Sequence, residues 1–425
     1  MWSKNVKSFI KHLMNHKMYA LITVFGFAIS LMFVILLSIY IKGELSTDQF
    51  HKNKDRIFRL VHSGGGHFAS PVGDRIMDTY PGVESYTRLY DYDEILTLPG
   101  NKKVKTSFLM ADSAFFTMFT FDLIEGDPAR VLETRNGIVL TRSYANKVFG
   151  RLSVVGEELK LGDRLSFIVT GIMEDLPQNT HFVQCDAIVN FRVLADIWGY
   201  PELLTTLDNN SFGLYFLAKP GSDLPSMAPL ILKDFRKDYW MFQNGRNDTL
   251  MFEALTDCYF SPFYNSGIRT KSKTPIRIYS AIALLILILA IINYINLTIS
   301  QAGFRGKEAA IRKILGSTRK RLIRQFLSES VSMCIVSFLL AMLLCFIAEP
   351  LFNSLLKTEL DLKQAINLPF VIVSVGFMLL LGIISGMLPS FAIVRFNPVD
   401  VVKGSLRRKS KSQSSKILIS FQFCF

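Results

Sequence analysis

The chain has 425 residues, a net charge of +13 and a pI near 9.4, a basic balance that would suit a nucleic-acid partner. Half of its residues are hydrophobic and its mean hydropathy is +0.29, values that exclude an ordinary soluble protein. Residues 18–41, 278–304, 330–348 and 364–394 contain no charged side chain. Because about 20 apolar residues in a helix cross a hydrocarbon core of about 30 Å, each of these runs predicts a transmembrane helix.

The first run, residues 18–41, has an alternative interpretation as a signal peptide, because lysines precede it. Its apolar core is longer than the roughly 7 to 15 residues of a signal peptide. The following Ile41-Lys42-Gly43-Glu44 is also not a small-residue cleavage site. We therefore predict a basic N-terminus over residues 1–17 and a retained transmembrane helix 1 over residues 18–41.

The positive charge predicts the orientation of the chain in the membrane. Residues 1–17, 305–324 and 395–416 together hold the whole positive surplus. Loops rich in Lys and Arg stay in the cytoplasm, so these three stretches are predicted on the cytoplasmic side. The region 43–277 and the loop 349–363 then lie outside. Since the charge has this membrane explanation and aromatic residues do not interleave with it, the nucleic-acid interpretation loses its support.

The region 43–277 is far too long for a loop and predicts a folded external domain. Short segments rich in β-branched and aromatic residues predict strands, and two segments with helical spacing predict helices. The predicted strands are residues 104–109, 137–140, 165–171 and 214–218, and the predicted helices are residues 71–80 and 143–149. Strands and helices without regular alternation indicate an α+β fold.

The segment His62-Ser-Gly-Gly-Gly-His67 is the one candidate metal site of the external region. No Cys or carboxylate cluster stands near it at ligand spacing, so a surface turn is the favoured interpretation. The sequence also lacks the G-x-x-x-x-G-K-[ST] phosphate-binding loop. We therefore expect no metal, no cofactor and no ATP hydrolysis by this chain.

Two further groups in the external region have competing interpretations. Asp91, Asp93 and Glu94 form an acidic cluster, for which a solvated face is favoured over a catalytic pair. Cys185 and Cys258 could form a disulfide, but their spacing does not decide the question.

The predicted spans contain polar and small residues at helical spacing. Asn293, Asn296 and Ser300 share one face of the second span, where hydrogen bonding between helices is favoured over a polar path for a substrate. Gly26 with Ser30, and Gly382 with Gly386, are pairs of small residues that permit close approach of helices.

Residues 305–324, which separate the second span (278–304) from the third (325–348), are basic and amphipathic. Five apolar residues keep to one side at helical spacing: Ile311, Ile314, Leu315, Leu322 and Phe326. Gly316 is a helix terminator and Ser317 a candidate N-cap. We predict a helix over residues 306–315, a tight corner, and a second helix that continues into the third span.

The fourth span, residues 364–394, is followed by a cytoplasmic linker over residues 395–416. The last segment, residues 417–425, is apolar but too short to cross a bilayer. It is either an interfacial tail or the start of a truncated fifth span, and we favour the second.

Several of these segments resemble the MacB/FtsX family of ABC transporter permeases. The matching run after the second span is Glu308-Ala-Ala-Ile-Arg-Lys-Ile-Leu-Gly-Ser317, followed by Gln325-Phe-Leu-Ser-Glu329. The external region resembles the MacB-like periplasmic core domain at residues 48–59, 111–119, 126–128, 139–141 and 169–177, and residues 386–390 and 397–399 resemble the end of the family's fourth span.

The resemblance implies four transmembrane helices with a large α+β extracytoplasmic domain between the first and the second. It implies a multi-pass protein of the cell inner membrane with a cytoplasmic N-terminus. Residues 305–324 would be a coupling helix and corner that dock on a separate ABC ATPase subunit. Glu308, Ile311, Arg312, Lys313 and Gly316 would carry the coupling. Ala310, where the family often has Gly, departs from the pattern and makes the corner slightly stiffer.

The implied function is mechanotransmission, in which ATP hydrolysis moves the external domain for export or extraction of a substrate. An alternative is a transmembrane regulator that drives an external cell-wall enzyme through the same coupling. The partners implied are the ATPase, a periplasmic adaptor or outer-membrane component, and membrane lipid. The chain would be the N-terminal half of a double-length permease of the Bacteroidetes type, or would pair as a homodimer. Lipoprotein, peptide, antibiotic and lipid all stay open as substrates.

Overall fold

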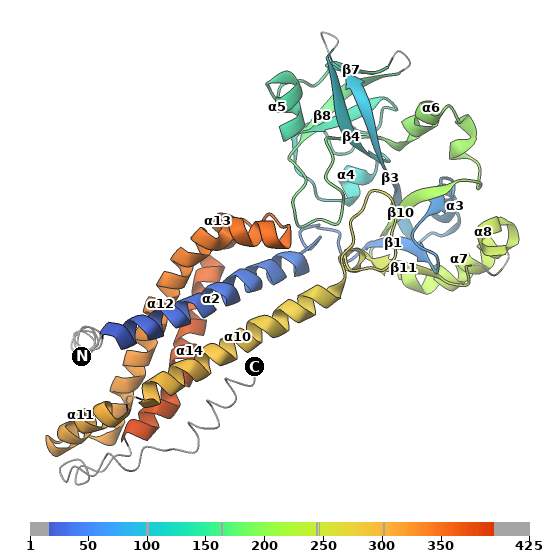
Figure 1. The fold of residues 1–425 in the computed structure, drawn as a ribbon. Helices are drawn as coiled ribbons and strands as arrows, with labels where there is room; N and C mark the ends of the chain where they lie inside the picture. Colours follow the sequence, from blue (N-terminus) through green and yellow to red (C-terminus); the bar gives the residue numbers. More distant parts are fainter. Residues whose placement is uncertain are drawn as a thin grey trace. The chain divides into compact units, whose positions relative to one another are not determined.

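The computed structural model describes residues 17–98, 102–162, 165–243, 245, 247–300 and 302–394. The chain divides into two units (Figure 1): an inserted domain, Gly43–Lys273, and a helical unit made of the chain before and after it. The predicted linker 395–416 and the terminal segment 417–425 lie outside the described residues, as does nearly all of the predicted N-terminus.

Among the residues that the structure describes, the helical unit contains four helices long and apolar enough to cross a membrane, which confirms the predicted fold class. They are α2 (Lys17–Leu45), α10 (Lys273–Ser300), α12 (Arg319–Leu356) and α14 (Leu368–Val394). Two shorter helices accompany them: α11 (Ala302–Ile314) and α13 (Leu362–Ala365). Large aliphatic side chains remain exposed all along the long helices, as expected for surfaces that face lipid.

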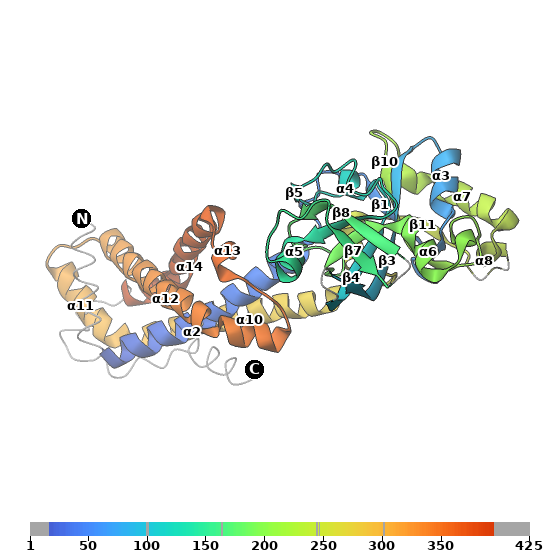
Figure 2. The ribbon, with the colours of Figure 1, turned by 90° about the horizontal axis from the view of Figure 1, so that it is seen from above.

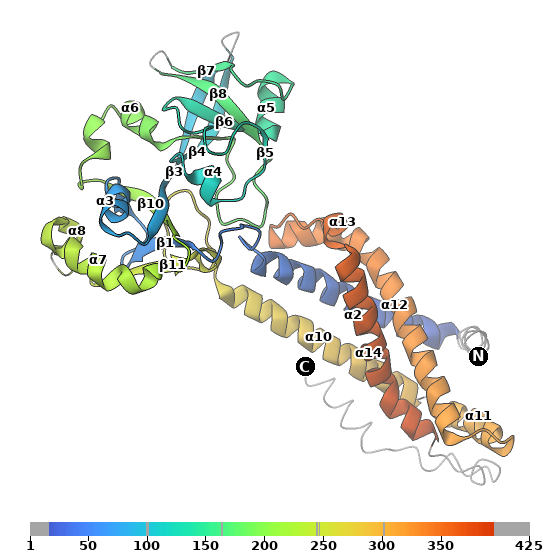
Figure 3. The same cartoon turned by 180° about the vertical axis from the view of Figure 1, so that it is seen from behind.

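Helices α12 and α14 pack side by side (Figure 3), and glycine permits their close approach. A Cβ atom added at Gly382 would lie 2.7 Å from the Cα of Val331, and one at Gly386 would lie 2.5 Å from Oγ of Ser330. The predicted pair of small residues is therefore used between two helices of the same chain.

The loop predicted at residues 349–363 is shorter in the structure, because α12 continues to Leu356 with Pro350 inside it. The helix ends at Lys357, which has a left-handed backbone. The Asn353 side chain then closes the turn, since its Oδ1 accepts from the Leu360 N–H at 3.1 Å and its Nδ2 donates to the Leu360 carbonyl at 2.9 Å.

The inserted domain is an α+β fold built on a sheet with eleven strands. The strands are β1 (Ile57–His62), β2 (Phe68–Ala69), β3 (Val83–Thr97), β4 (Lys103–Ala111), β5 (Leu123–Glu125), β6 (Gly137–Thr141), β7 (Glu158–Leu161), β8 (Leu165–Met173), β9 (Ala187–Asn190), β10 (Asn210–Ala218) and β11 (Leu250–Ala254). The helices are α3 (Val72–Thr79), α4 (Phe115–Met118), α5 (Arg142–Phe149), α6 (Leu194–Trp198), α7 (Leu224–Asp238), α8 (Trp240–Gln243) and α9 (Leu255–Cys258), with 3-10 turns at Phe191–Val193 and Pro201–Leu204.

The four strands and two helices predicted in this domain all form, as β4, β6, β8, β10, α3 and α5. Helix α5 shows the local signals clearly. Thr141 caps its start, because the Thr141 hydroxyl accepts from the Tyr144 N–H at 3.3 Å. Gly150, with φ of 66°, ends it in the left-handed conformation that glycine adopts without cost.

The strand order is β11-β1-β10-β3-β4-β9-β6-β8-β5, with β4/β9 and β6/β8 parallel and the other neighbours antiparallel. Strand β7 pairs with β8 and also with the far end of β3, at Thr97 and Lys160. These pairings close β3, β4, β9, β6, β8 and β7 into a ring. At the other end of the domain, α3, α7 and α8 gather beside β1, β10 and β11 (Figure 2).

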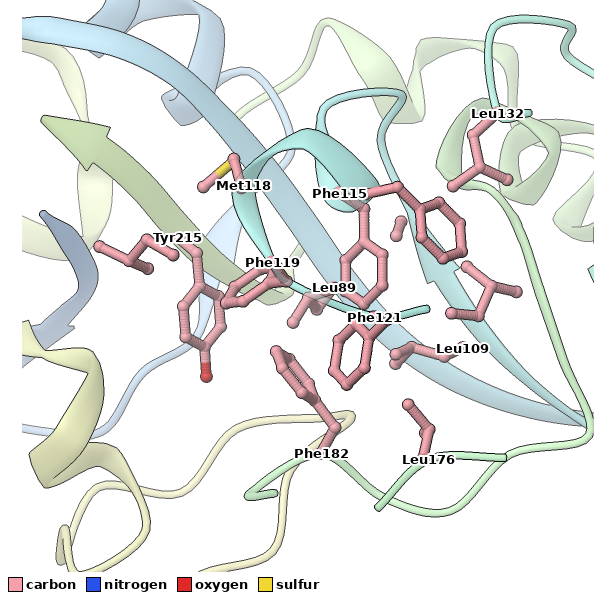
Figure 4. Close-up of a cluster of buried hydrophobic side chains, with 14 of the residues drawn as sticks. Leu89, Leu109, Phe115, Met118, Phe119, Phe121, Leu132, Leu176, Phe182 and Tyr215 are labelled. Atoms are coloured by element: carbon pink, nitrogen blue, oxygen red, sulfur yellow. The ribbon is translucent and has the colours of Figure 1, made fainter. Parts of the chain in front are cut away.

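Three hydrophobic clusters fill the domain, one of them inside the ring of strands and one beneath α3 and α7. The third is rich in aromatic rings (Figure 4) and is built around α4. Phe119 lies 4.9 Å from Phe182 and 5.7 Å from Tyr215 between ring centroids, in edge-on geometry. Such contacts add about 0.5–1.5 kcal/mol each to the burial of the rings, so this cluster stabilises the domain.

Candidate functional site

The predicted corner between the second and third spans is present, and its backbone bonds explain it. Gly316 has φ of 90°, and its N–H donates to the Lys313 carbonyl at 3.0 Å. The Ser317 N–H donates to the Arg312 carbonyl at 2.9 Å. This pair of bonds is a Schellman motif, which ends α11 and needs a left-handed residue at the position of Gly316.

The residue that caps the next helix differs from the prediction. Thr318, and not Ser317, is the N-cap of α12, because the Thr318 hydroxyl accepts from the Arg321 N–H at 3.4 Å. Ser317 is instead used in the Schellman motif, so the start of α12 moves by one residue.

The inner face of α11 packs against the first turns of α12 and the end of α14. The contact is a small hydrophobic cluster whose buried members come from all three helices: Ala309, Leu322, Phe326, Ile393 and Val394. Small side chains on α11 let it lie close to both neighbours. The cluster therefore attaches α11 to two of the long helices.

A chain of polar contacts runs from α11 into α12. Arg312 donates from Nη2 to Oε1 of Glu308 at 2.6 Å, and from Nη1 to Oε1 of Gln325 at 2.7 Å. Gln325 in turn donates from Nε2 to Oε1 of Glu329 at 3.1 Å, where Glu329 is buried in α12. Arg312 therefore links the corner to a buried acid one turn further along the span.

Lys313 makes the second polar attachment of the corner. Its Nζ donates to the carbonyl of Val394, the last described residue of α14, at 2.6 Å. Arg312 and Lys313 thus both point inward, each to a different helix.

The outer face of α11 carries apolar side chains that nothing in the described chain covers. Ile311, Ile314 and Leu315 are 55%, 62% and 79% exposed. The sequence predicts them on one face with Leu322 and Phe326, and this prediction is wrong, because those two residues are buried on the opposite side of α11. The corner turns the chain, so helical spacing does not continue through Gly316.

Glu308 is also on the accessible part of α11. Its side chain is 48% exposed, and its ion pair with Arg312 is an ordinary pair four residues apart on a helix. Such pairs contribute a few tenths of a kcal/mol. Of the five predicted coupling residues, Arg312, Lys313 and Gly316 build the corner, Glu308 supports Arg312, and Ile311 lies on the free face.

The other candidates of the sequence have structural explanations. Nδ1 of His62 accepts a hydrogen bond from the Gly64 N–H at 3.0 Å, as in a turn. The described residues contain no group of three or more His, Cys, Asp or Glu side chains that could hold a metal ion. Asp93 lies exposed on β3, 2.7 Å from Nζ of Lys105. Cys185 and Cys258 are free thiols in the structure, so the disulfide that the sequence left open is not formed.

Asn296, on the predicted polar face of the second span, makes no hydrogen bond to another helix of the described chain. Both amide atoms of Asn296 are buried without a hydrogen-bond partner in the described chain, and the side chain of Ser300 lies outside what the structure describes. The bond between helices is made by Tyr294 of α10, whose hydroxyl donates to Oγ of Ser330 on α12 at 2.9 Å. The spacing of polar residues along α10 could not show that Tyr294, and not Asn296, makes the hydrogen bond to another helix.

The chain matches two protein families over two separate regions. Residues 20–232 match the MacB-like periplasmic core domain, and residues 280–398 match the FtsX-like permease C-terminal domain. The corner and its contacts fall within the second region.

Individual relatives agree with these matches. The macrolide export ATP-binding/permease protein MacB of Agrobacterium fabrum is 22% identical over 401 residues, which cover 91% of this chain and 58% of that protein. The protein of the same name from Pasteurella multocida is 25% identical over 303 residues, which cover 70% of this chain and 43% of that protein. The chain therefore spans about half the length of these relatives.

The chain is also similar to a solved structure over part of its length. The periplasmic region of MacB from Actinobacillus actinomycetemcomitans is 12% identical, with a TM-score of 0.34, and the alignment covers 48% of this chain and 89% of that one.

Proposed function

The chain belongs to the MacB/FtsX family of ABC transporter permeases, and we propose that it is a permease subunit that passes ATP-driven movement from a separate ATPase to the inserted domain. The observation that carries the proposal is the corner around α11. Its inner face is attached to α12 and α14, while Ile311, Ile314 and Leu315 form an apolar face that is more than half exposed in the described chain. We call these three residues the docking face.

The two sides of α11 suit the transfer of force between a partner and the membrane helices. A partner bound to the docking face would move α11 as a unit, because Arg312 and Lys313 bind it to α12 and α14. An interface needs an apolar centre with a polar rim, and Lys307 and Glu308, both exposed, supply the rim.

The proposal that the partner is an ATPase is supported by the names of the relatives and by the missing ATP-binding motif of this sequence. The relatives are named ATP-binding/permease proteins, and the sequence contains no G-x-x-x-x-G-K-[ST] phosphate-binding motif. Hydrolysis on a second subunit is part of the proposal. The positive charge of residues 305–324 supports the placement of the docking face, and of the N-terminus, in the cytoplasm.

The proposal is tested by site-specific photo-cross-linking in cells that express the chain together with a candidate partner ABC ATPase. A benzophenone amino acid replaces Ile314 on the docking face, and in a matched control it replaces Leu355, which is 72% exposed at the far end of α12. We expect an ATPase cross-link from position 314 only, and no ATP hydrolysis by the purified permease alone. A cross-link from position 355 alone, or hydrolysis by the isolated chain, would overturn the proposal.

A further inference from the structure

The inserted domain is joined to the long helices by two chain segments. The incoming segment follows α2, beginning at Gly43, and the outgoing segment precedes α10, ending at Lys273. Both segments bind the same loop, residues 178–182, which we call the tie loop. It follows β8 in the sequence and is far from either segment along the chain.

The incoming segment holds the tie loop through Asp48. The Asp48 N–H donates to the Asn179 carbonyl at 2.8 Å. The carboxylate accepts from the Thr180 hydroxyl at 2.9 Å, and from the N–H and Nδ1 of His181 at 3.1 and 2.8 Å. Asp48 is fully buried and has φ of 60°, a left-handed conformation that costs a residue with a side chain on the order of 1 kcal/mol or more.

The charge of Asp48 is stabilised within this contact. Burial by itself would raise the pKa of Asp48, but the neighbouring His181 and His51 outweigh burial and hold the pKa below its usual range. The carboxylate is therefore ionised and fully engaged with the tie loop, which is the arrangement that keeps a buried charge stable.

The outgoing segment holds the tie loop through Arg269. The Arg269 guanidinium donates from Nε and Nη2 to the Thr180 carbonyl at 3.1 and 2.8 Å, and from Nη2 to the Gln178 carbonyl. The Arg269 N–H donates to the His181 carbonyl at 2.8 Å. Asp48 and Arg269 thus bind the same few residues from two separate segments.

The two segments are also joined directly. Glu44 accepts from Nζ of Lys271 at 2.7 Å and from the Tyr259 hydroxyl at 2.7 Å. The Lys271 N–H donates to the Tyr259 carbonyl at 2.7 Å. The Glu44 side chain is only 9% exposed, so solvent screens this pair less than an ordinary surface ion pair.

The tie loop itself is anchored in the core of the domain. Nε2 of His181 lies 2.8 Å from the Tyr215 hydroxyl on β10. Phe182 enters the aromatic cluster beside Phe119 and Tyr215 (Figure 4). Because the loop is fixed to the core of the domain, both connecting segments are fixed to it as well.

We propose that the tie loop, Asp48, Arg269 and the Glu44–Lys271 pair fasten the outer ends of α2 and α10 to one another and to the inserted domain. Force that arrives through either helix is then shared by both connections and moves the domain as one body. These are positioning residues for the transfer of movement. The nucleotide-dependent part of this inference rests on the proposed permease function.

The distance between two spin labels tests the tie. The labels are carried by unnatural amino acids at Lys42 and Arg277, exposed positions just outside the two segments, so that the native cysteines stay in place. Pulsed electron paramagnetic resonance measures the distance between the labels on the full chain in nanodiscs. One state contains no nucleotide, and the other contains the bound ATPase with ATP and vanadate. For the native tie we expect one distance population that is the same in both states.

Two variants release the tie and one restores it. Glu44→Lys breaks the direct pair, and Arg269→Gln removes the guanidinium that binds the tie loop. We expect either change to add a second, broader distance population, and Glu44→Lys with Lys271→Glu to return the native one. Arg75→Gln is the matched control, because Arg75 pairs with Asp234 and Asp238 elsewhere in the domain.

The outcomes separate the tie from the proposed function. Native distances in both tie variants, or the same broadening in Arg75→Gln, would overturn the tie. Thermal unfolding of each variant checks that the inserted domain is folded. If these residues only stabilised the domain, the variants would have a lower melting temperature, and the charge swap would not restore the native distance. The measurement without nucleotide needs no ATPase, so the tie can hold even if position 314 fails to cross-link.

Discussion

The docking face predicts a specific loss of affinity for the ATPase. Ile314→Ser with Leu315→Ser removes two side chains that are 62% and 79% exposed. Because the rest of the chain covers so little of them, the change should alter the stability of the permease by less than about 1 kcal/mol. The corner, which depends on Gly316 and not on these side chains, should stay intact.

The size of the effect follows from the exposed fractions. Full burial of a Leu or Ile side chain contributes about 2 kcal/mol. If the ATPase covers the exposed parts of Ile314 and Leu315, their contribution to binding is about 3 kcal/mol, or roughly a hundredfold in the dissociation constant. Serine at both positions should weaken binding by about this factor.

Binding is measured between the permease in nanodiscs and the purified ATPase by microscale thermophoresis. The matched control is Leu351→Ser with Leu355→Ser, since these leucines are 63% and 72% exposed at the opposite end of α12. We expect native affinity for the control. A change of less than about threefold in the docking-face variant, or an equal loss in the control, would refute the burial of this face by the ATPase.

Three other changes test the remaining contacts. Arg312→Glu with Lys313→Glu removes both inward attachments of α11, so ATP hydrolysis should continue without coupled movement while the permease stays folded, and coupling at the native level would contradict this. Gly382→Val places a side chain against the backbone of α12 and should lower stability by about 1–3 kcal/mol in thermal unfolding, whereas Gly376→Val, where nothing lies within 4 Å of a Cβ, should not. Burial lowers the pKa of His51, so the unfolded chain takes up the proton first on acidification. The free energy of unfolding of the inserted domain should therefore fall as the pH drops below about 6.5, which denaturation followed by tryptophan fluorescence can check.

The membrane spans and the corner could be predicted because their signals are local. An uncharged run of sufficient length must either cross the bilayer or be buried, whatever the rest of the chain does. Gly316 ends a helix because its backbone can be left-handed, a property that belongs to the residue itself. The strands at residues 104–109 and 214–218 follow from β-branched and aromatic composition in the same way.

The contacts of the site could not be predicted, because they join residues that lie far apart in the sequence. The spacing of Ile311, Ile314 and Leu315 identifies an apolar face of α11 but not the direction in which it points. That direction is set by Ile393 and Val394 of α14, which cover the opposite face. The same holds for Gln325, whose role depends on Arg312 reaching it across the corner.

The sequence by itself determined the four membrane helices of the described chain, the place of the inserted domain and the position of the corner, because hydrophobic length, charge and backbone freedom act over a few residues. Only the tertiary structure decided which side of α11 stays exposed in the described chain and which residues of the two connecting segments bind the tie loop. Asp48, Arg269 and the tie loop are separated by long stretches of chain. They come into contact because the strands that lie between them in the sequence fold into one sheet. Such contacts exist only once the whole domain has folded.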